Sequence, residues 1–174
     1  MKFSYFYKSP VILFLLKALG LYVAWYIIYE IWLHPTEIMD SWIIKSTLQV
    51  SLFFLHLMGY HTFSPYFKEI GIDGTSGLYM GDNCDSIDLF ALFAGFIIAF
   101  PGAWKKKLWY IPVGIILIFL CNVLRVVVLS IIQKKFSTGA LEFNHTYTFT
   151  ILVYLFIFGL WLFWIKKMVL PQTV

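Results

Sequence analysis

Long runs of hydrophobic residues, separated by short polar segments, dominate the pattern of this chain. A helix needs about 20 apolar residues to cross a bilayer core of about 30 Å. Four runs reach or approach that length: Val11–Leu33, Leu89–Trp104, Leu108–Ile132 and Thr146–Ile165. The pattern therefore predicts an all-α, polytopic membrane protein, with residues 1–174 forming a single transmembrane domain.

A further stretch, Trp42–Tyr60, is apolar but carries Lys45, Gln49 and His56 at helical spacing. It could cross the membrane with this polar stripe facing the bundle, or lie in the membrane interface. We favour a crossing, because a run of this length with one lysine near its end can span. The bundle would then have five helices, and otherwise four.

The segment of about residues 61–83 is the one sizeable stretch that is not continuously apolar. Its turn sequence Asp73–Gly77 lies between two short runs, Phe67–Ile72 and Leu78–Met80. Turn residues between such runs are typical of a β-hairpin. We therefore expect a small hairpin outside the membrane.

Lysines in short loops favour the cytoplasmic side of a membrane. Lys105–Lys107 separate two predicted spans, and Lys166 with Lys167 follow the last one. Counting back from these cytoplasmic points places both Cys84 and His145 on the extracytoplasmic side. The N-terminus is inside, as Lys2 and Lys8 suggest, only if Trp42–Tyr60 does not cross.

Composition supports the membrane assignment and excludes other classes. The chain is 61% hydrophobic and only 13% charged, far from the usual balance of soluble domains. The positively charged residues form short clusters beside apolar runs, so no continuous surface for nucleic acid is expected. No phosphate-binding loop, dinucleotide fingerprint or convincing metal site occurs, and we expect no cofactor and no bound metal.

The sole arginine, Arg125, lies about seven residues before the outer end of its predicted span, or roughly 10 Å deep. An arginine inside the membrane is costly, so such residues usually face the bundle and mark a functional site. Asn122 lies one helical turn away on the same face. The alternative is a structural arginine bonded to backbone carbonyls.

Of the two cysteines, only Cys84 lies near a helix N-terminus and near water. The helix dipole and a nearby guanidinium would favour its thiolate, whereas Asp85 and Asp88 would oppose it. Cys121 lies within an apolar run and is expected to be a packed core residue. The alternative for Cys84 is a small, inert hydrophobic side chain.

His145 opens the last predicted span at the same outer level, directly after Asn144. Imidazole is the commonest general acid–base group near neutral pH. Cys84, Arg125 and His145 would thus supply a nucleophile, an anion-stabilising group and a proton carrier on one membrane face. A non-catalytic membrane chaperone or assembly factor, and a small transporter, are the alternatives.

The segments Asn83–Asp85, Asn122–Arg125 and Asn144–His145 occur in the order cysteine, arginine, histidine that is found in the exosortase/archaeosortase family. The chain resembles the short bacterial exosortases of this family over about residues 81–165. One position departs from the family's pattern: the small residue, commonly glycine, two places after the cysteine is Ser86 here, preceded by Asp85.

The resemblance implies a cysteine protease or transpeptidase of the bacterial inner membrane, with its active site on the extracytoplasmic side. Cys84 would be the nucleophile, Arg125 its basic partner and His145 the proton-transfer residue, supported by Asn122, Asn144 and Asp85. The substrates would be membrane-anchored proteins with a C-terminal signal of motif, helix and basic tail, transferred to a surface acceptor.

Overall fold

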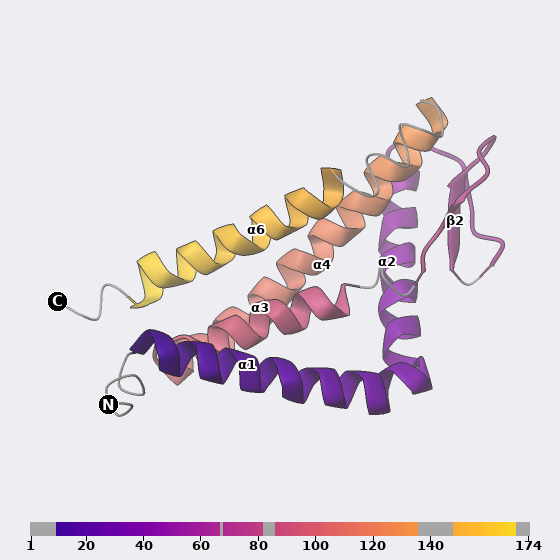
Figure 1. Cartoon of the computed structure of the whole chain (residues 1–174). Coiled ribbons are helices and arrows are strands. Elements are labelled where there is room, and N and C mark those ends of the chain that lie inside the picture. Colours follow the sequence, from indigo (N-terminus) through magenta and orange to yellow (C-terminus); the bar gives the residue numbers. More distant parts are fainter. Residues whose placement is uncertain (1–9, 67, 82–85, 136–147, 170–174) are drawn as a thin grey trace, which may run out of the picture.

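The computed structural model describes residues 10–66, 68–81, 86–135 and 148–169, and is mostly helical (Figure 1). Its α-helices are α1 (Pro10–Ile28), α2 (Ile38–Leu57), α3 (Ile87–Ala99), α4 (Trp104–Lys135) and α6 (Phe149–Phe163). A π-helical turn, Tyr29–Leu33, and a 3₁₀ turn, His34–Thr36, extend α1, and a second π-helical segment, Trp164–Val169, extends α6. Three short strands, β1 (Thr62–Phe63), β2 (Glu69–Ile72) and β3 (Leu78–Tyr79), form one sheet.

Four helical segments of the described chain are long and apolar enough to cross a membrane: Val11–Thr36, Ile38–Leu57, Trp104–Lys135 and Phe149–Val169. This confirms the prediction of an all-α, polytopic membrane protein. Large apolar side chains are exposed along α1 and much of α6, for example Leu19 and Leu155. Such surfaces are stable only in contact with lipid or another apolar partner.

The predicted span Leu89–Trp104 extends past the C-terminal end of the helix that the structure shows, α3. The helix α3 has 13 residues, about 20 Å at 1.5 Å per residue, which is shorter than the bilayer core of about 30 Å. It ends because Phe100 is extended, with φ −72° and ψ 143°, the conformation that a following proline imposes. Pro101 is that proline, and Trp104 instead begins α4.

The three lysines expected in a connecting loop belong to the first turn of α4, which has 32 residues. The Lys107 side chain is buried and its ammonium donates to the carbonyls of Ile98 (2.9 Å) and Phe100 (2.6 Å). These are carbonyls at the C-terminal end of α3, which no further helical turn can satisfy. Lys107 therefore caps α3 rather than simply marking the cytoplasmic side.

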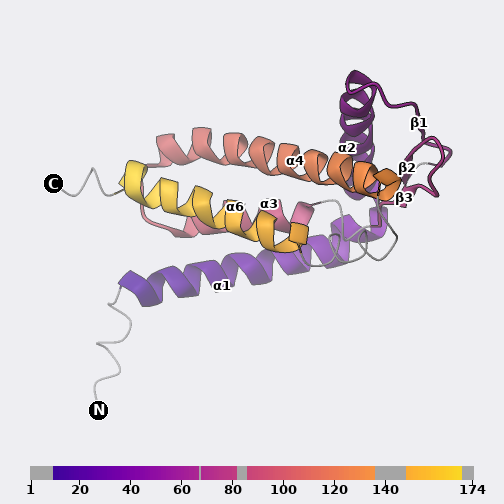
Figure 2. The ribbon, with the colours of Figure 1, turned by 90° about the horizontal axis from the view of Figure 1, so that it is seen from above.

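Helix α2 lies at one end of the bundle, with its axis crosswise to those of α1, α3, α4 and α6 (Figures 1 and 2). The turn between α1 and α2 is held by Tyr29, whose hydroxyl donates to the buried carboxylate of Asp40 at 3.0 Å. The polar stripe Lys45, Gln49 and His56 is exposed rather than facing the bundle. Length and composition allow α2 to cross. Its crosswise direction and exposed stripe also suit the interfacial alternative, and the crossing stays a prediction.

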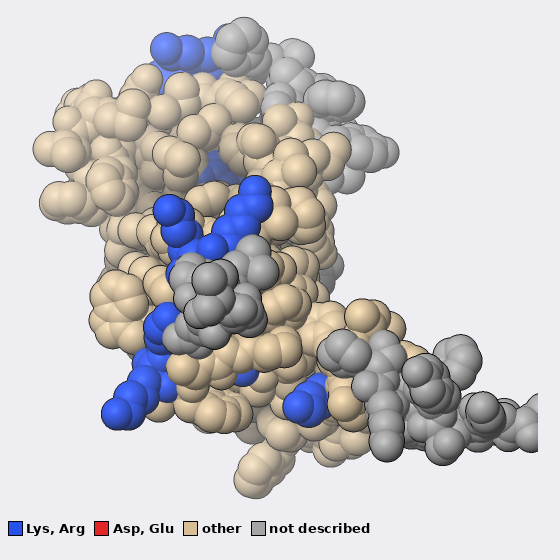
Figure 3. All heavy atoms as spheres, turned by 90° about the vertical axis from the view of Figure 1, so that its left-hand side faces the viewer, with Lys and Arg blue, Asp and Glu red and all other residues tan. Residues whose placement is uncertain are grey.

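The termini of the described chain and the beginning of α4 lie at one end of the bundle (Figure 1). Lys106 donates to the carbonyl of Met168 at 3.3 Å, so the lysine-rich start of α4 meets the lysine-rich end of α6. Figure 3 looks onto this end and shows basic side chains but no acidic ones. We call it the lysine end. Lysines gathered at one end favour the cytoplasmic side, and this orientation stays a prediction.

The sheet lies beside α2 and the far part of α4, away from the lysine end (Figures 1 and 2). Its strands are antiparallel in the order β1-β2-β3, with Phe63 opposite Gly71 and Ile70 opposite Leu78. The predicted hairpin is confirmed as β2 and β3, and β1 adds a strand that was not predicted. Ile70 and Ile72 are fully buried in a core shared with α2 and α4.

Candidate functional site

Only part of the predicted site lies within the described residues. Cys84, Asp85, Asn144 and His145 fall outside them, so their proximity to one another stays a prediction. Arg125 and Asn122 both lie on α4, three residues apart and therefore on neighbouring positions of one helix face. Asn122 is buried and Arg125 is half-buried.

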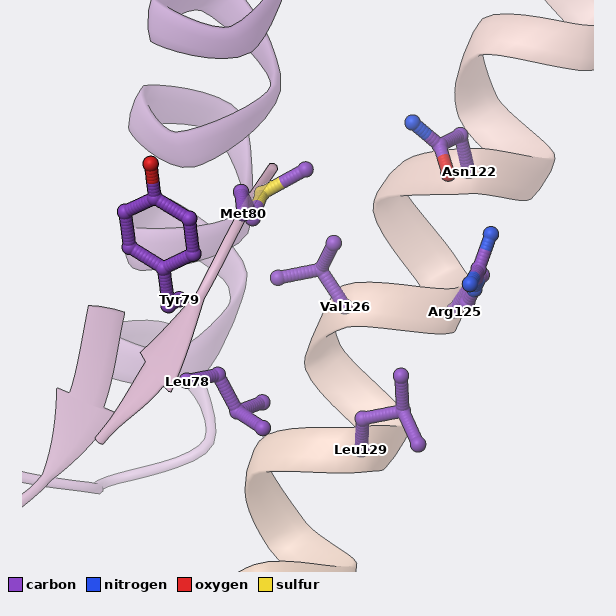
Figure 4. Close-up of a pocket in the computed structure, with 7 residues that line it drawn as sticks. All are labelled: Leu78, Tyr79, Met80, Asn122, Arg125, Val126 and Leu129. Carbon is purple, nitrogen blue, oxygen red and sulfur yellow. The ribbon is translucent and has the colours of Figure 1, made fainter. Parts of the chain in front are cut away.

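Asn122 and Arg125 line a small cavity between α4 and strand β3 (Figure 4). Its other walls are Leu78, Tyr79 and Met80 on the strand side and Val126 and Leu129 on α4. The sequence separation from Met80 to Cys84 is four residues, so the strand wall leads directly into the segment that carries the candidate nucleophile. Sequence reasoning missed Tyr79 and Met80, because apolar side chains in a short strand carry no signal of a site.

The far end of α4 fixes the sheet beside this cavity. Gln133 donates to the hydroxyl of Ser76 (3.0 Å) and the carbonyl of Gly77 (2.8 Å), both in the turn before β3. Lys134 reaches the carbonyl of Asp73 at 3.5 Å. Because α4 continues to Lys135, Arg125 lies about 15 Å from its end rather than about 10 Å, and the sheet covers the intervening turns.

Ser86, which precedes α3 and follows Cys84 by two residues, has an unusual backbone. Its φ is 69° and its ψ 11°, in the left-handed region that costs a residue with a side chain roughly 1–2 kcal/mol. The residue is also buried. Glycine adopts this conformation freely, which gives a physical reason for the glycine that the resemblance leads one to expect here.

We expect Ser86→Gly to keep or raise stability by up to about 1 kcal/mol, and Ser86→Val to lower it by more, because a β-branched residue is strained at positive φ. Thermal unfolding of the purified chain in detergent measures both. Ser64→Gly serves as the control, because Ser64 is exposed and lies outside the helices. Equal melting temperatures for Ser86→Gly and Ser86→Val would contradict the strained backbone.

Cys121 lies on α4, where it is partly buried against the core formed by α3, α4 and α6. This agrees with the packed role predicted for it. Within the described ranges, no group of three or more histidine, cysteine, aspartate or glutamate side chains could hold a metal ion.

The helices and their lipid-facing surfaces define the chain as a multi-pass membrane protein. Residues 5–165 match the family model of the transmembrane exosortases. The match covers most of the chain, and the protein therefore belongs to the exosortase family. No curated protein and no solved structure matches it.

Proposed function

We propose that this exosortase is a membrane-embedded cysteine transpeptidase or protease that cleaves surface proteins at the outer face of the bacterial inner membrane. The observation that carries the proposal is the cavity lined by Arg125 and Asn122, whose opposite wall leads within four residues to Cys84. A guanidinium and an amide on one helix face offer several hydrogen-bond donors to a developing negative charge.

In the proposed reaction, the Cys84 thiolate attacks the scissile carbonyl carbon and forms a carbon–sulfur bond. The carbonyl electrons move onto the oxygen, where Arg125 stabilises the oxyanion. The carbon–nitrogen bond then breaks, His145 donates a proton to the leaving amine, and a thioester remains. An amine of a surface acceptor, or water, releases the substrate from Cys84.

The proposed substrates are membrane-anchored proteins whose C-terminal signal combines a motif, a helix and a basic tail. Such a tail would lie with the lysine end of the enzyme on the cytoplasmic side, and the motif with the sheet on the opposite side. Asn144 and Asp85 are proposed to support His145 and Cys84.

The reactivity and sidedness of Cys84 test this proposal without a known substrate. In a Cys121→Ser background, a membrane-impermeant maleimide should label Cys84 in intact spheroplasts at neutral pH. Arg125→Gln should slow labelling about tenfold, because a nearby cation favours the thiolate. A cysteine at the exposed Lys167, placed in a chain without Cys84 and Cys121, should be labelled only after lysis. Labelling of Lys167→Cys before lysis, or an unchanged rate for Cys84 without Arg125, would contradict the proposal.

A further inference from the structure

A cleft of about 410 Å³ opens between α1, α3 and α6. Its floor is α3, where the small residues Ala91 and Gly95 leave room, and its walls include Leu21 of α1 and Tyr154 of α6. The lining is largely apolar. The cleft is separate from the cavity beside Arg125, because the two share no lining residue.

The cleft reaches only part of the way along the bundle. Its lining on α1 and the π-helical turn after it runs from Ala18 to Glu30, about 18 Å at 1.5 Å per residue, compared with about 30 Å for the whole bilayer core. Toward the lysine end, aromatic side chains from three helices close the bundle. The ring of Phe96 (α3) stacks on that of Trp161 (α6), with 4.2 Å between the ring centroids, and meets the ring of Phe14 (α1) edge-on at 5.4 Å. The depth of the cleft is therefore close to one lipid leaflet.

Two carboxylates lie at the end of the cleft away from the lysine end. Glu30 belongs to the π-helical turn after α1, and Asp88 to the first turn of α3. Both residues are exposed, and neither carboxylate has a salt bridge or hydrogen bond to another part of the described chain. Unpaired carboxylates beside a hydrocarbon surface are costly, and a cationic group placed between them would lower that cost.

We propose that the cleft binds one aminophospholipid, such as phosphatidylethanolamine, from the leaflet opposite the lysine end. Its acyl chain would lie against Leu21, Gly95 and Tyr154, and its ammonium group would meet Glu30 and Asp88. Charge and depth both favour this occupant. A transmembrane helix crosses the full bilayer, so it would extend beyond the cleft and collide with the packed aromatic side chains of Phe14, Phe96 and Trp161.

Native mass spectrometry of the full chain in detergent tests the charge recognition. With equal amounts of phosphatidylethanolamine and phosphatidylglycerol of the same acyl chains, the protein should retain one lipid and prefer the former by about fivefold or more, the effect of one interfacial ion pair. Glu30→Gln with Asp88→Asn should bring the preference close to one. Glu37→Gln with Asp73→Asn, two exposed acids outside the cleft, should leave it unchanged.

A second variant tests the cleft itself. A side chain at Gly95 would meet nothing within 4 Å at its first carbon, so Gly95→Phe should fill the cleft without displacing the backbone. It should abolish lipid retention, whereas Gly159→Phe, an equally open glycine of α6 outside the cleft, should not. Equal retention of both lipids by the unmodified chain would overturn the proposal.

Two further outcomes would also overturn it by identifying another occupant. If Gly95→Phe kept the lipid but stopped processing of a substrate, the cleft would hold the substrate's helix. If it instead dissolved a dimer seen with the unmodified chain, the cleft would hold a second copy. Lipid retention does not depend on whether Cys84 is a nucleophile, so the lipid site and the proposed catalysis fail or stand separately.

Discussion

Replacing Cys84 by serine or alanine is expected to abolish processing of a protein that carries the C-terminal signal, by about 10⁴-fold or more. The reason is that the proposed reaction makes and breaks a bond to this sulfur. A serine hydroxyl at the same position is a much weaker nucleophile than a thiolate. The measurement is conversion of the substrate from its full-length to its shortened form in cells.

Cys121→Ser is the matched control for this experiment. Cys121 is partly buried on α4 and packs against the apolar core, so its substitution should leave processing within a fewfold of normal. Membrane abundance of each variant is measured by immunoblot. Processing that survives Cys84→Ala, or that is lost in Cys121→Ser at normal abundance, would show that the wrong thiol has been assigned.

Arg125→Lys is expected to damage processing nearly as much as Arg125→Ala, by about 10²–10³-fold, the usual effect of losing one oxyanion donor. A guanidinium presents a planar fork of N–H donors that an ammonium cannot reproduce, so charge alone should not suffice. Arg125 also lies beside the strand that leads to Cys84. The ammonium of a lysine at this position would not occupy the place of the guanidinium N–H groups, so it would be displaced from the reacting carbonyl.

Lys134→Arg is the matched control, since Lys134 lies on the same helix but is exposed, and its ammonium reaches the Asp73 carbonyl and the ring of Tyr60. It should process normally. A purely structural Arg125 predicts a different pattern, in which the lysine variant keeps most activity and the alanine variant loses abundance. Near-normal processing by Arg125→Lys at normal abundance would therefore contradict the donor role.

Hydrophobic run length predicted the long helices well, because lipid contact requires continuous apolar sequence whatever the tertiary packing. It predicted α3 less well. Trp104 is as apolar as the run before it, so only Pro101 and the extended Phe100 reveal that the helix ends earlier. The role of Lys107 as a cap was also hidden, since a lysine cluster is an orientation signal in sequence and a hydrogen-bond donor in the fold.

The sequence could not predict how the axis of α2 is oriented relative to the other helices. A helix with apolar residues and a polar stripe satisfies the pattern of a span and of an interfacial helix equally. The structure adds that Ile44, Leu48 and Leu55 are buried against the sheet and α4, and whether α2 crosses the membrane stays a prediction. The strain at Ser86 likewise depends on a backbone angle that no residue identity reveals.

For the candidate site, sequence identified Arg125 and Asn122 from their cost inside a membrane, and the structure adds the strand wall opposite them. The apolar strand residues Tyr79 and Met80 carry no such cost and could not be recognised. The positions of Cys84 and His145 stay predictions that rest on chain order, topology and family membership.

The most direct test of the proposed catalysis is capture of the thioester between Cys84 and its substrate. Purified enzyme and a signal-bearing substrate are mixed in detergent without an amine acceptor, and the products are analysed by intact mass. The account predicts an adduct of the enzyme with the N-terminal substrate fragment, released by neutral hydroxylamine and absent from Cys84→Ala. Cleavage of the substrate by Cys84→Ala, or an adduct that remains on another residue, would contradict it.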